Sequence, residues 1–190
     1  MELLWYDIRQ LDQEAMARTV AMMDEERRRR VSDIAGEDDR KRTVAGELLA
    51  RRALAQRLGC GEGEAPLRWD DTGKPAADAD GVYVSVSHSG PYAVCAVADV
   101  PVGVDVEVIR SADEKFMRRV CSEAEMAYIR VGDDGDCARF WETWTAKEAL
   151  FKLTGKGPLL ALSRLAVPAG VVLDHVMQRG CALTVALRLQ

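Results

Sequence analysis

Hydrophobic and polar residues alternate along three segments in the middle of the chain, residues 82–88, 92–99 and 102–108. Successive side chains of a strand point to opposite faces, so this period of two predicts three strands. Another strand is predicted at 2–8, and the alternating tail at about 163–189 predicts two or three more.

Apolar residues recur with a helical period in four other stretches. These are residues 12–31, 38–58, 111–131 and 137–154. The second is expected to end at Gly59, since glycine is a common helix stop signal. Each half of the chain therefore offers both helices and strands. This organisation predicts an α+β protein with two similar lobes, residues 1–100 and 101–190.

The predicted strand 102–108 carries two acids on one face. Its valines share one face, whereas Gly103, Asp105 and Glu107 share the other. Two unit charges about 6 Å apart repel by about 3 kcal/mol at an effective dielectric near 20. Such a pair persists if it is solvated at an exposed strand end, if one acid is protonated, or if a cation lies between them. Carboxylates are ligands that Mg²⁺ accepts, usually together with phosphate oxygens of a substrate.

A third acid lies in the predicted helix that contains FWETWTAKEALFK. On a helix, Glu148 falls within one arc of about 100° with four aromatic residues. These are Phe140, Trp141, Trp144 and Phe151. One interpretation is a surface ion pair of Glu148 with Lys152; it leaves the acid's place among aromatic residues unexplained. A carboxylate on an apolar face needs a cation or a proton, so a functional role is favoured.

One of the two histidines, His88, is predicted to end a strand in SVSHSG. Ser87 and His88 are adjacent on a strand and point to opposite faces, so they do not form a nucleophile–base pair. The imidazole and the hydroxyl groups suit contact with a phosphate. A histidine with a purely structural role is the alternative.

Basic residues are concentrated in the first half of the chain. Arginines occur in the run 27–30 and at Arg42, with Lys74 in the predicted turn WDDTGKP. Acids interrupt the run and no aromatic residues lie between, which argues against nucleic-acid binding. Two interpretations stay open: a solvated helix face, or a small polyanionic ligand held by a few arginines.

Composition narrows the class of protein. The chain has 190 residues, 48% of them hydrophobic and 30% charged, which is ordinary for a globular protein. The net charge of −5 argues against steering to nucleic acid or to an anionic membrane. No apolar run suits a membrane span or a signal peptide. Five cysteines without a CxxC pair favour free thiols in a reducing compartment, so we expect a cytoplasmic protein.

Three carboxylates, flanking lysines, a histidine and a basic lobe indicate displacement at a phosphorus centre. The ordered motifs narrow this class. GKP (73–75), SVSHSG (85–90), GVDVE (103–107) and WTAKEALFK (144–152) together resemble the Sfp-type 4′-phosphopantetheinyl transferases over about residues 2–170. The resemblance implies a pseudo-twofold pair of α+β lobes with coenzyme A bound in a cleft between them. It also implies a monomeric, Mg²⁺-dependent enzyme, with Mn²⁺ able to substitute.

By that resemblance, the enzyme transfers the phosphopantetheine arm of coenzyme A to a serine of an apo acyl, peptidyl or aryl carrier protein and releases adenosine 3′,5′-bisphosphate. Asp105, Glu107 and Glu148 resemble the metal ligands, and Glu148 also resembles the base, acting directly or through a metal-bound water. Lys152 resembles the cation that stabilises the leaving group, and Lys147 a neighbouring support. The residues similar to coenzyme contacts are Arg27, Arg30, Arg42, Thr43, Lys74, Ser87 and His88.

Two other classes of function stay open. A metal-dependent phosphoesterase or nuclease would use the same three acids. A binding module without catalytic activity is a second alternative, although it would have no reason to keep three negative charges together. The sequence does not identify the carrier protein.

Overall fold

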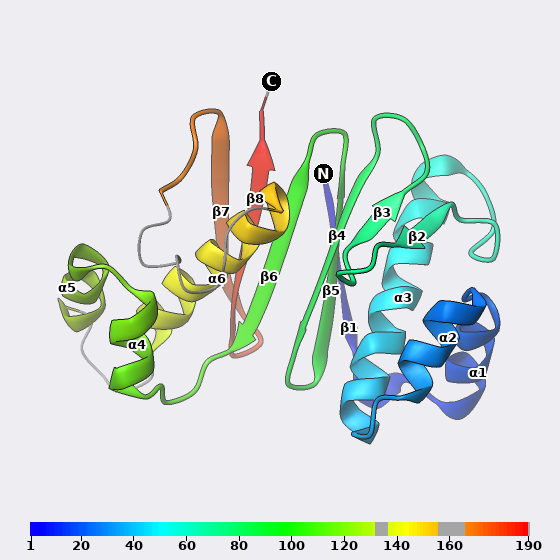
Figure 1. The fold of residues 1–190 in the computed structure, drawn as a ribbon, viewed down its shortest axis with the longest axis horizontal. Coiled ribbons are helices and arrows are strands. Elements are labelled where there is room, and N and C mark those ends of the chain that lie inside the picture. The colour runs from blue at the N-terminus through cyan, green and yellow to red at the C-terminus, as the bar shows by residue number, and fades with distance from the viewer. Residues whose placement is uncertain (132–136, 156–165, 190) are drawn as a thin grey trace. The chain divides into compact units, whose positions relative to one another are not determined.

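The computed structural model describes residues 1–131, 137–155 and 166–189. The chain divides into two compact units, Met1–Val102 and Gly103–Gln190. Each unit contains helices and a three-stranded sheet (Figure 1), which confirms the predicted α+β class. None of the described helices combines the length and the hydrophobicity needed to cross a membrane.

The sheet of the first unit has the strand order β1-β5-β4, and β2 and β3 form a separate pair. All these pairings are antiparallel. The strands are β1 (Glu2–Asp7), β2 (Leu67–Trp69), β3 (Pro75–Ala77), β4 (Tyr83–Ser89) and β5 (Tyr92–Ala98). The strands predicted from period-two alternation in this unit are thus confirmed. The predicted turn at WDDTGKP joins β2 to β3 and is closed by a hydrogen bond from the Gly73 amide to the Asp70 carbonyl, 2.9 Å long.

Helices occupy the first half of this unit. They are the short η1 (Ile8–Gln10), α1 (Gln13–Ala21), α2 (Glu25–Ser32) and α3 (Glu37–Leu58). The prediction of one helix over 12–31 is wrong, because Asp24 accepts a hydrogen bond from the Arg27 amide and so caps a new helix after a break. The predicted end of α3 at Gly59 is confirmed, with a φ of 70° that glycine adopts without strain.

The core of the first unit lies between α3 and the sheet. The contact is close at Gly46, where an added Cβ would stand 2.9 Å from a methyl group of Val86. Small residues on α3 therefore let this helix lie directly on β4. The fully buried α3 residues in this core are Val44, Ala45, Ala50, Ala53 and Leu54.

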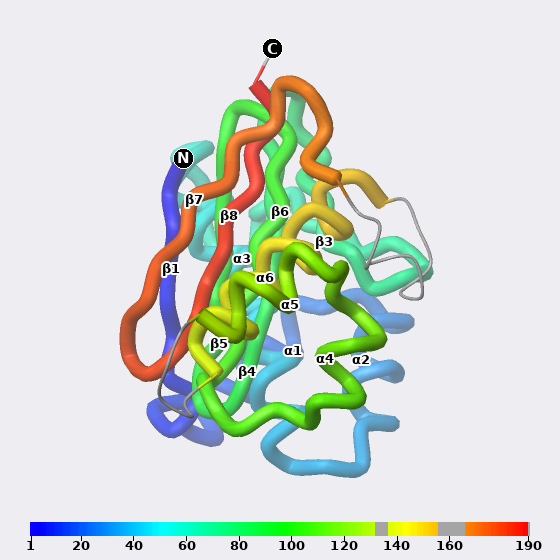
Figure 2. Tube along the Cα trace, turned by 90° about the vertical axis from the view of Figure 1, so that its left-hand side faces the viewer, coloured from blue at the N-terminus to red at the C-terminus, as the bar shows by residue number. Residues whose placement is uncertain are grey.

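The second unit has a sheet with the strand order β6-β8-β7, and these strands lie side by side in Figure 2. Its elements are β6 (Val102–Val108), α4 (Glu114–Val120), α5 (Glu123–Val131), α6 (Ala138–Thr154), β7 (Val171–Gln178) and β8 (Cys181–Arg188). The predicted tail contains two strands, and its first residues, 163–165, lie outside the described residues. The single helix predicted at 111–131 is wrong, because Cys121 is extended and Ser122 starts a new helix.

Helix α6 lies against the face of β6 that carries Gly103 and Asp105 (Figure 1). Both faces of β6 are consequently buried from Val102 to Val106, so the interpretation of an exposed strand end is wrong. The predicted buried stripe of α6 is correct at its first three aromatic residues. Phe151 is only half-buried, and the buried side continues instead through Ala149, Leu150 and Leu153, the residues nearest the backbone of β6.

Candidate active site

The carboxylate of Asp105 is brought against α6 by the close approach of that helix to β6. Asp105 is 5% exposed, and its Oδ1 accepts a hydrogen bond of 2.8 Å from Nζ of Lys152. The Lys152 side chain is 27% exposed, so the pair lies at the edge of the buried region. The strand and the helix thus bring together two of the predicted site residues.

The other two acids lie beside this pair. Glu107 is half-buried, and its Oε2 is 3.6 Å from a guanidinium nitrogen of Arg110. Among the described residues, Oε1 of Glu148 is a buried oxygen with no hydrogen-bond partner. Burial raises the pKa of Glu148, the charges of Asp105 and Glu107 raise it further, and Lys152 opposes them. Glu148 is therefore a more basic carboxylate than an ordinary glutamate.

These carboxylates suit a hard divalent cation in their chemistry. Mg²⁺ prefers oxygen ligands of this kind. The buried Oε1 of Glu148 accepts no hydrogen bond, so it can still coordinate such an ion. In the described part of the chain, however, no three His, Cys, Asp or Glu side chains are grouped so that they could hold a metal ion. Lys152 supplies the positive charge beside Asp105 in this arrangement.

Lys147 is held differently from Lys152. It is 3% exposed, and its Nζ donates to the Val120 carbonyl and to Oε2 of Glu125, each at 2.8 Å. The same Glu125 oxygen accepts a hydrogen bond from the Ser122 amide, which caps α5. Lys147 therefore joins α6 to the start of α5, and these contacts are structural in kind.

In the first unit, three of the predicted coenzyme contacts gather where the start of α3 meets the end of β4. Arg42 donates to the Gly90 carbonyl at 3.0 Å and pairs with the exposed carboxylate of Asp39. This guanidinium lowers the pKa of Asp39, and His88 lies near enough to lower it further. Thr43 donates to the Asp39 carbonyl at 2.9 Å.

Ser87 and His88 follow the expected alternation of a strand. Ser87 is buried and His88 is exposed. The two side chains therefore belong to opposite faces of β4, as the sequence predicts. Of the two side chains, His88 is therefore the more exposed.

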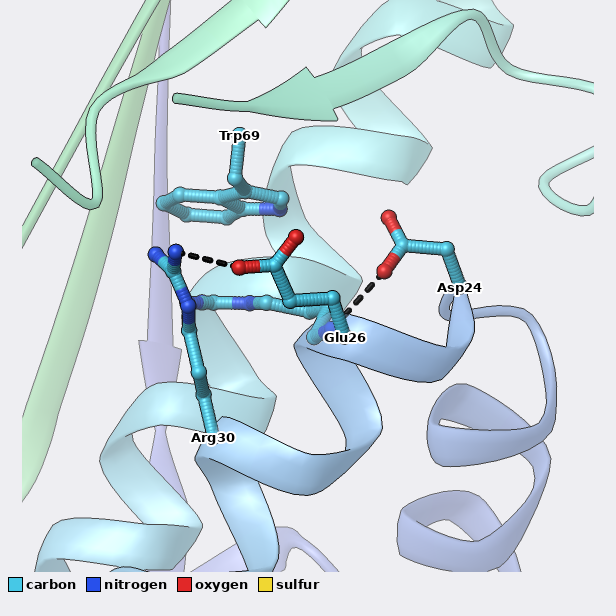
Figure 3. Close-up of a pocket in the computed structure, with 5 residues that line it drawn as sticks. Asp24, Glu26, Arg30 and Trp69 are labelled. Carbon is cyan, nitrogen blue, oxygen red and sulfur yellow. Dashed lines mark hydrogen bonds and ion pairs between the residues drawn. The ribbon is translucent and has the colours of Figure 1, made fainter. Parts of the chain in front are cut away.

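Arg27 and Arg30 line a pocket with Asp24, Glu26 and Trp69. Figure 3 shows the Trp69 ring, from β2, lying over Glu26 and Arg30 of α2. Arg30 pairs with Glu26 at 2.6 Å and approaches the Asp70 carbonyl at 3.4 Å. The pocket is thus continuous with the β2–β3 turn.

Lys74 lies in that turn. Its amide donates to Oδ1 of Asp70 at 2.9 Å, and its side chain is half-buried. The structure therefore brings Arg27, Arg30 and the turn of Lys74 together.

Sequence reasoning missed two residues of this pocket region. Trp69 was not singled out, although it directly precedes the turn. Glu47 was not singled out either, and it is 1% exposed in the middle of α3. A glutamate inside the apolar run VAGELLA was the available signal, because a buried acid needs partners.

Comparison with known proteins assigns both halves of the chain to one family. Residues 10–100 match the family model for the N-terminal part of 4′-phosphopantetheinyl transferases. Residues 101–170 match the model of the 4′-phosphopantetheinyl transferase superfamily. These two matches together span most of the chain, and they give no support to a phosphoesterase or a nuclease.

Individual relatives carry the same name. The 4′-phosphopantetheinyl transferase gsp of Aneurinibacillus migulanus is 33% identical over 126 residues, 66% of this chain and 53% of the relative. The 4′-phosphopantetheinyl transferase Sfp of Bacillus subtilis is 27% identical over 164 residues, 85% of this chain and 73% of the relative. A phosphopantetheinyl transferase of Thraustochytrium is 32% identical over 166 residues, 78% of this chain and 58% of the relative.

The chain thus spans between about half and three quarters of the length of these relatives. The motifs that carry the resemblance in sequence lie in both matched regions, and the acids and lysine of the second region meet in one site. The chain belongs to the 4′-phosphopantetheinyl transferase superfamily.

Proposed function

We propose that this protein transfers the 4′-phosphopantetheine arm of coenzyme A to a serine of an apo carrier protein. The observation that carries the proposal is the buried, partnerless Oε1 of Glu148 beside Asp105 and Lys152, in a chain of this superfamily. Such a carboxylate can act as a ligand of a metal ion and as a proton acceptor. The carrier is an acyl, peptidyl or aryl carrier protein.

Asp105, Glu107 and Glu148 would hold Mg²⁺, or Mn²⁺ in its place, only together with the pyrophosphate of the coenzyme, since by themselves the described side chains form no three-ligand group that could hold the ion. The ion, when bound, neutralises charge on the pyrophosphate. Because the ammonium group of Lys152 already lies beside Asp105, it would form an ion pair with the same phosphates.

In the transfer, the serine oxygen forms a bond to the phosphorus that carries the pantetheine arm. The bond from that phosphorus to the bridging oxygen breaks, and adenosine 3′,5′-bisphosphate leaves. Glu148 takes the proton of the serine hydroxyl, directly or through a water, and its raised pKa suits this role. Lys152 stabilises the negative charge on the leaving group. Lys147, buried against Glu125, supports the helix that carries both residues.

The coenzyme phosphates and adenosine would be bound by residues of the first unit. They are Arg27, Arg30, Arg42, Thr43, Lys74, Ser87 and His88. Arg30 and Arg42 are paired with carboxylates that are 60% and 64% exposed, so a phosphate can replace those partners. Arginine matches phosphate geometry with two parallel hydrogen bonds.

The same proposal includes a monomeric enzyme in the cytoplasm that does not bind nucleic acid or membranes. The net charge of −5 supports the absence of nucleic-acid and anionic-membrane partners. Gel filtration of the purified chain tests whether it is a monomer. Its retention on heparin tests whether it binds a polyanion such as nucleic acid.

Mass spectrometry of carrier proteins tests the proposed transfer. Purified apo carriers of the three kinds are incubated with the protein, coenzyme A and Mg²⁺. We expect at least one carrier to gain the mass of phosphopantetheine on its serine, and a parallel reaction in EDTA to show no gain. A protein that binds coenzyme A yet modifies no carrier, or that only hydrolyses the coenzyme, would overturn the proposal.

A further inference from the structure

A buried carboxylate organises the pocket of Arg27. Glu47 is 1% exposed on α3, and its Oε2 accepts a hydrogen bond of 2.6 Å from the indole nitrogen of Trp69. Its Oε1 accepts a hydrogen bond of 2.8 Å from Nε of Arg51. The third contact is an ion pair without a hydrogen bond: Nε of Arg27 lies 3.5 Å from Oε2. One acid thus holds residues from α2, α3 and β2.

Arg27 is fixed on more than one side by this arrangement. Its guanidinium carbon lies 3.8 Å from the centroid of the Trp69 ring, and its side chain is 11% exposed. Burial lowers the pKa of Arg27, and the negative charge of Glu47 raises it again in part. Glu47 contacts Nε, the nitrogen nearest the stem. The two terminal nitrogens are therefore the donors with which Arg27 can meet a phosphate.

The backbone that precedes α2 is tied to the same carboxylate. Nη2 of Arg51 donates to the Met22 carbonyl at 2.8 Å, just before the Asp24 cap of α2. Glu47 therefore orients the Arg27 side chain directly, and through Arg51 it holds the start of the helix from which Arg27 projects.

The neighbouring Arg30 offers a natural contrast. It pairs with Glu26 at 2.6 Å, and the Glu26 side chain is 60% exposed. An exposed carboxylate can rotate toward the solvent when a phosphate binds. The buried Glu47 cannot move into solvent and stays beside Arg27. The two arginines of one pocket thus have one exchangeable and one permanent counter-ion.

We propose that Glu47, with Trp69, is a positioning residue that aims the terminal nitrogens of Arg27 at the 3′-phosphate of coenzyme A, the group near which the resemblance in sequence places Arg27. The inference deepens the proposed function and rests on it, because it takes Arg27 as a coenzyme contact. Glu47 touches no substrate. It sets the preference for coenzyme A over 3′-dephospho-coenzyme A.

The test compares these two coenzymes on the full chain with Mg²⁺, by calorimetric titration and by KM in carrier modification. We expect the wild type to prefer coenzyme A by about tenfold or more, since a charge-assisted hydrogen bond supplies that much. Arg27→Ala should remove most of this preference. Glu47→Gln should lower it at least about fivefold, and Trp69→Phe, which keeps an aromatic ring but deletes the donor to Glu47, should lower it about threefold.

The sign of the change separates the possible roles of Glu47. If Glu47 were only a nearby negative charge, Glu47→Gln would raise the preference, and if it only stabilised the fold, the preference would stay constant. Either result overturns the inference. Glu26→Gln is the matched control, and we expect it to tighten coenzyme binding by freeing Arg30. Should Glu47→Gln fail to fold, Trp69→Phe decides in the same way.

Failure of the proposed function looks different. A wild type that transfers nothing from coenzyme A contradicts that function itself. A wild type that turns over both coenzymes with equal KM contradicts the role of Arg27. In a third case, Arg27→Ala removes the preference for coenzyme A, but Glu47→Gln and Trp69→Phe leave it intact. This result contradicts only the positioning role of Glu47.

Discussion

Gly103 of β6 lies directly against Ala149 of α6: a Cβ atom at Gly103 would stand 2.1 Å from the Ala149 carbonyl oxygen. The nearest backbone nitrogen, of Leu153, would be 2.6 Å away. No side chain fits at such distances, so this position requires glycine. The close approach brings Lys152 to Asp105, two residues farther along the strand.

Replacing Gly103 by alanine should push α6 away from β6. Overpacking a core costs about 1–3 kcal/mol, and the clash with two backbone atoms places this change at or above the upper limit. We expect the melting temperature to fall by about 6 °C or more and transfer to be lost even where the variant remains folded. Differential scanning calorimetry and the carrier assay measure both. Gly63→Ala, in an exposed loop, is the control and should change neither; wild-type behaviour of Gly103→Ala would contradict the packing described.

Glu148→Gln should separate activity from stability. It keeps the shape of the side chain but removes the charge that burial and the neighbouring acids disfavour. Turnover should fall by at least about 10²-fold, while coenzyme A still binds. In EDTA the variant should melt at the same temperature as the wild type or higher. Glu142→Gln on the same helix is the control. Near-normal turnover would show that the serine proton leaves by another route, and a lower melting temperature would contradict the unfavourable charge.

The two lysines of α6 should fail in different ways. Lys147→Met deletes a buried ion pair with Glu125, whose side chain is 29% exposed, and should cost about 2 kcal/mol of folding free energy. Lys152→Met leaves the buried carboxylate of Asp105 without this ion pair, so it should also lower the melting temperature; unlike Lys147→Met, it should in addition weaken coenzyme binding and turnover, because its charge would meet the pyrophosphate. Thermal denaturation beside steady-state kinetics distinguishes them. The reverse pattern would make Lys147 the catalytic cation.

The basic residues of the first unit should act on the coenzyme rather than on the carrier. Alanine variants of Arg42, Lys74 and His88 should each raise KM for coenzyme A several-fold and leave KM for the carrier unchanged. Arg52→Ala, which removes an exposed pair with Glu62, is the control. An altered carrier KM with unchanged coenzyme kinetics would mean that this surface binds the carrier.

Thiol reactivity should follow burial. Burial raises the pKa of both Cys121 and Cys181 to about 11, and it raises that of Cys95 further. Because the thiolate is the nucleophile, only about one in 10³ of a thiol with pKa 11 is reactive at pH 8. We expect iodoacetamide to modify the half-buried Cys60 and Cys137 first in the native protein and all cysteines in urea. Mass spectrometry of tryptic peptides reads this order, and early labelling of Cys181 would contradict it.

The sequence predicted the strands and the mixed class because their signals are local. Alternation over 82–88 and 102–108 and the stop at Gly59 need only neighbouring residues. The breaks at Asp24 and Ser122 were missed, because each cap lies inside a longer helical period and its effect depends on one or two side-chain hydrogen bonds. Propensity alone does not reveal such a bond.

The residues proposed for the site stood out in the sequence where charged side chains occur in apolar surroundings. Asp105 on a valine strand and Glu148 among aromatic residues were visible as misplaced charges. The partner of Lys147 was not, because Glu125 lies 22 residues away on another helix. Glu47 was overlooked for the same reason, since the meaning of an acid on α3 depends on an arginine of α2 and a tryptophan of β2.

The exposed partners of Arg30 and Arg42 have a consequence for selectivity. Each arginine already carries a carboxylate of its own chain, so a single anion such as chloride or inorganic phosphate gains little by replacing one ion pair with another. A ligand with several phosphate groups at fixed spacing can replace both carboxylates, while it loses the translational and rotational entropy of only one binding event. In the proposed binding mode, Glu26 and Asp39 would therefore favour ligands with several phosphate groups over single anions, and we expect millimolar inorganic phosphate to compete poorly with coenzyme A.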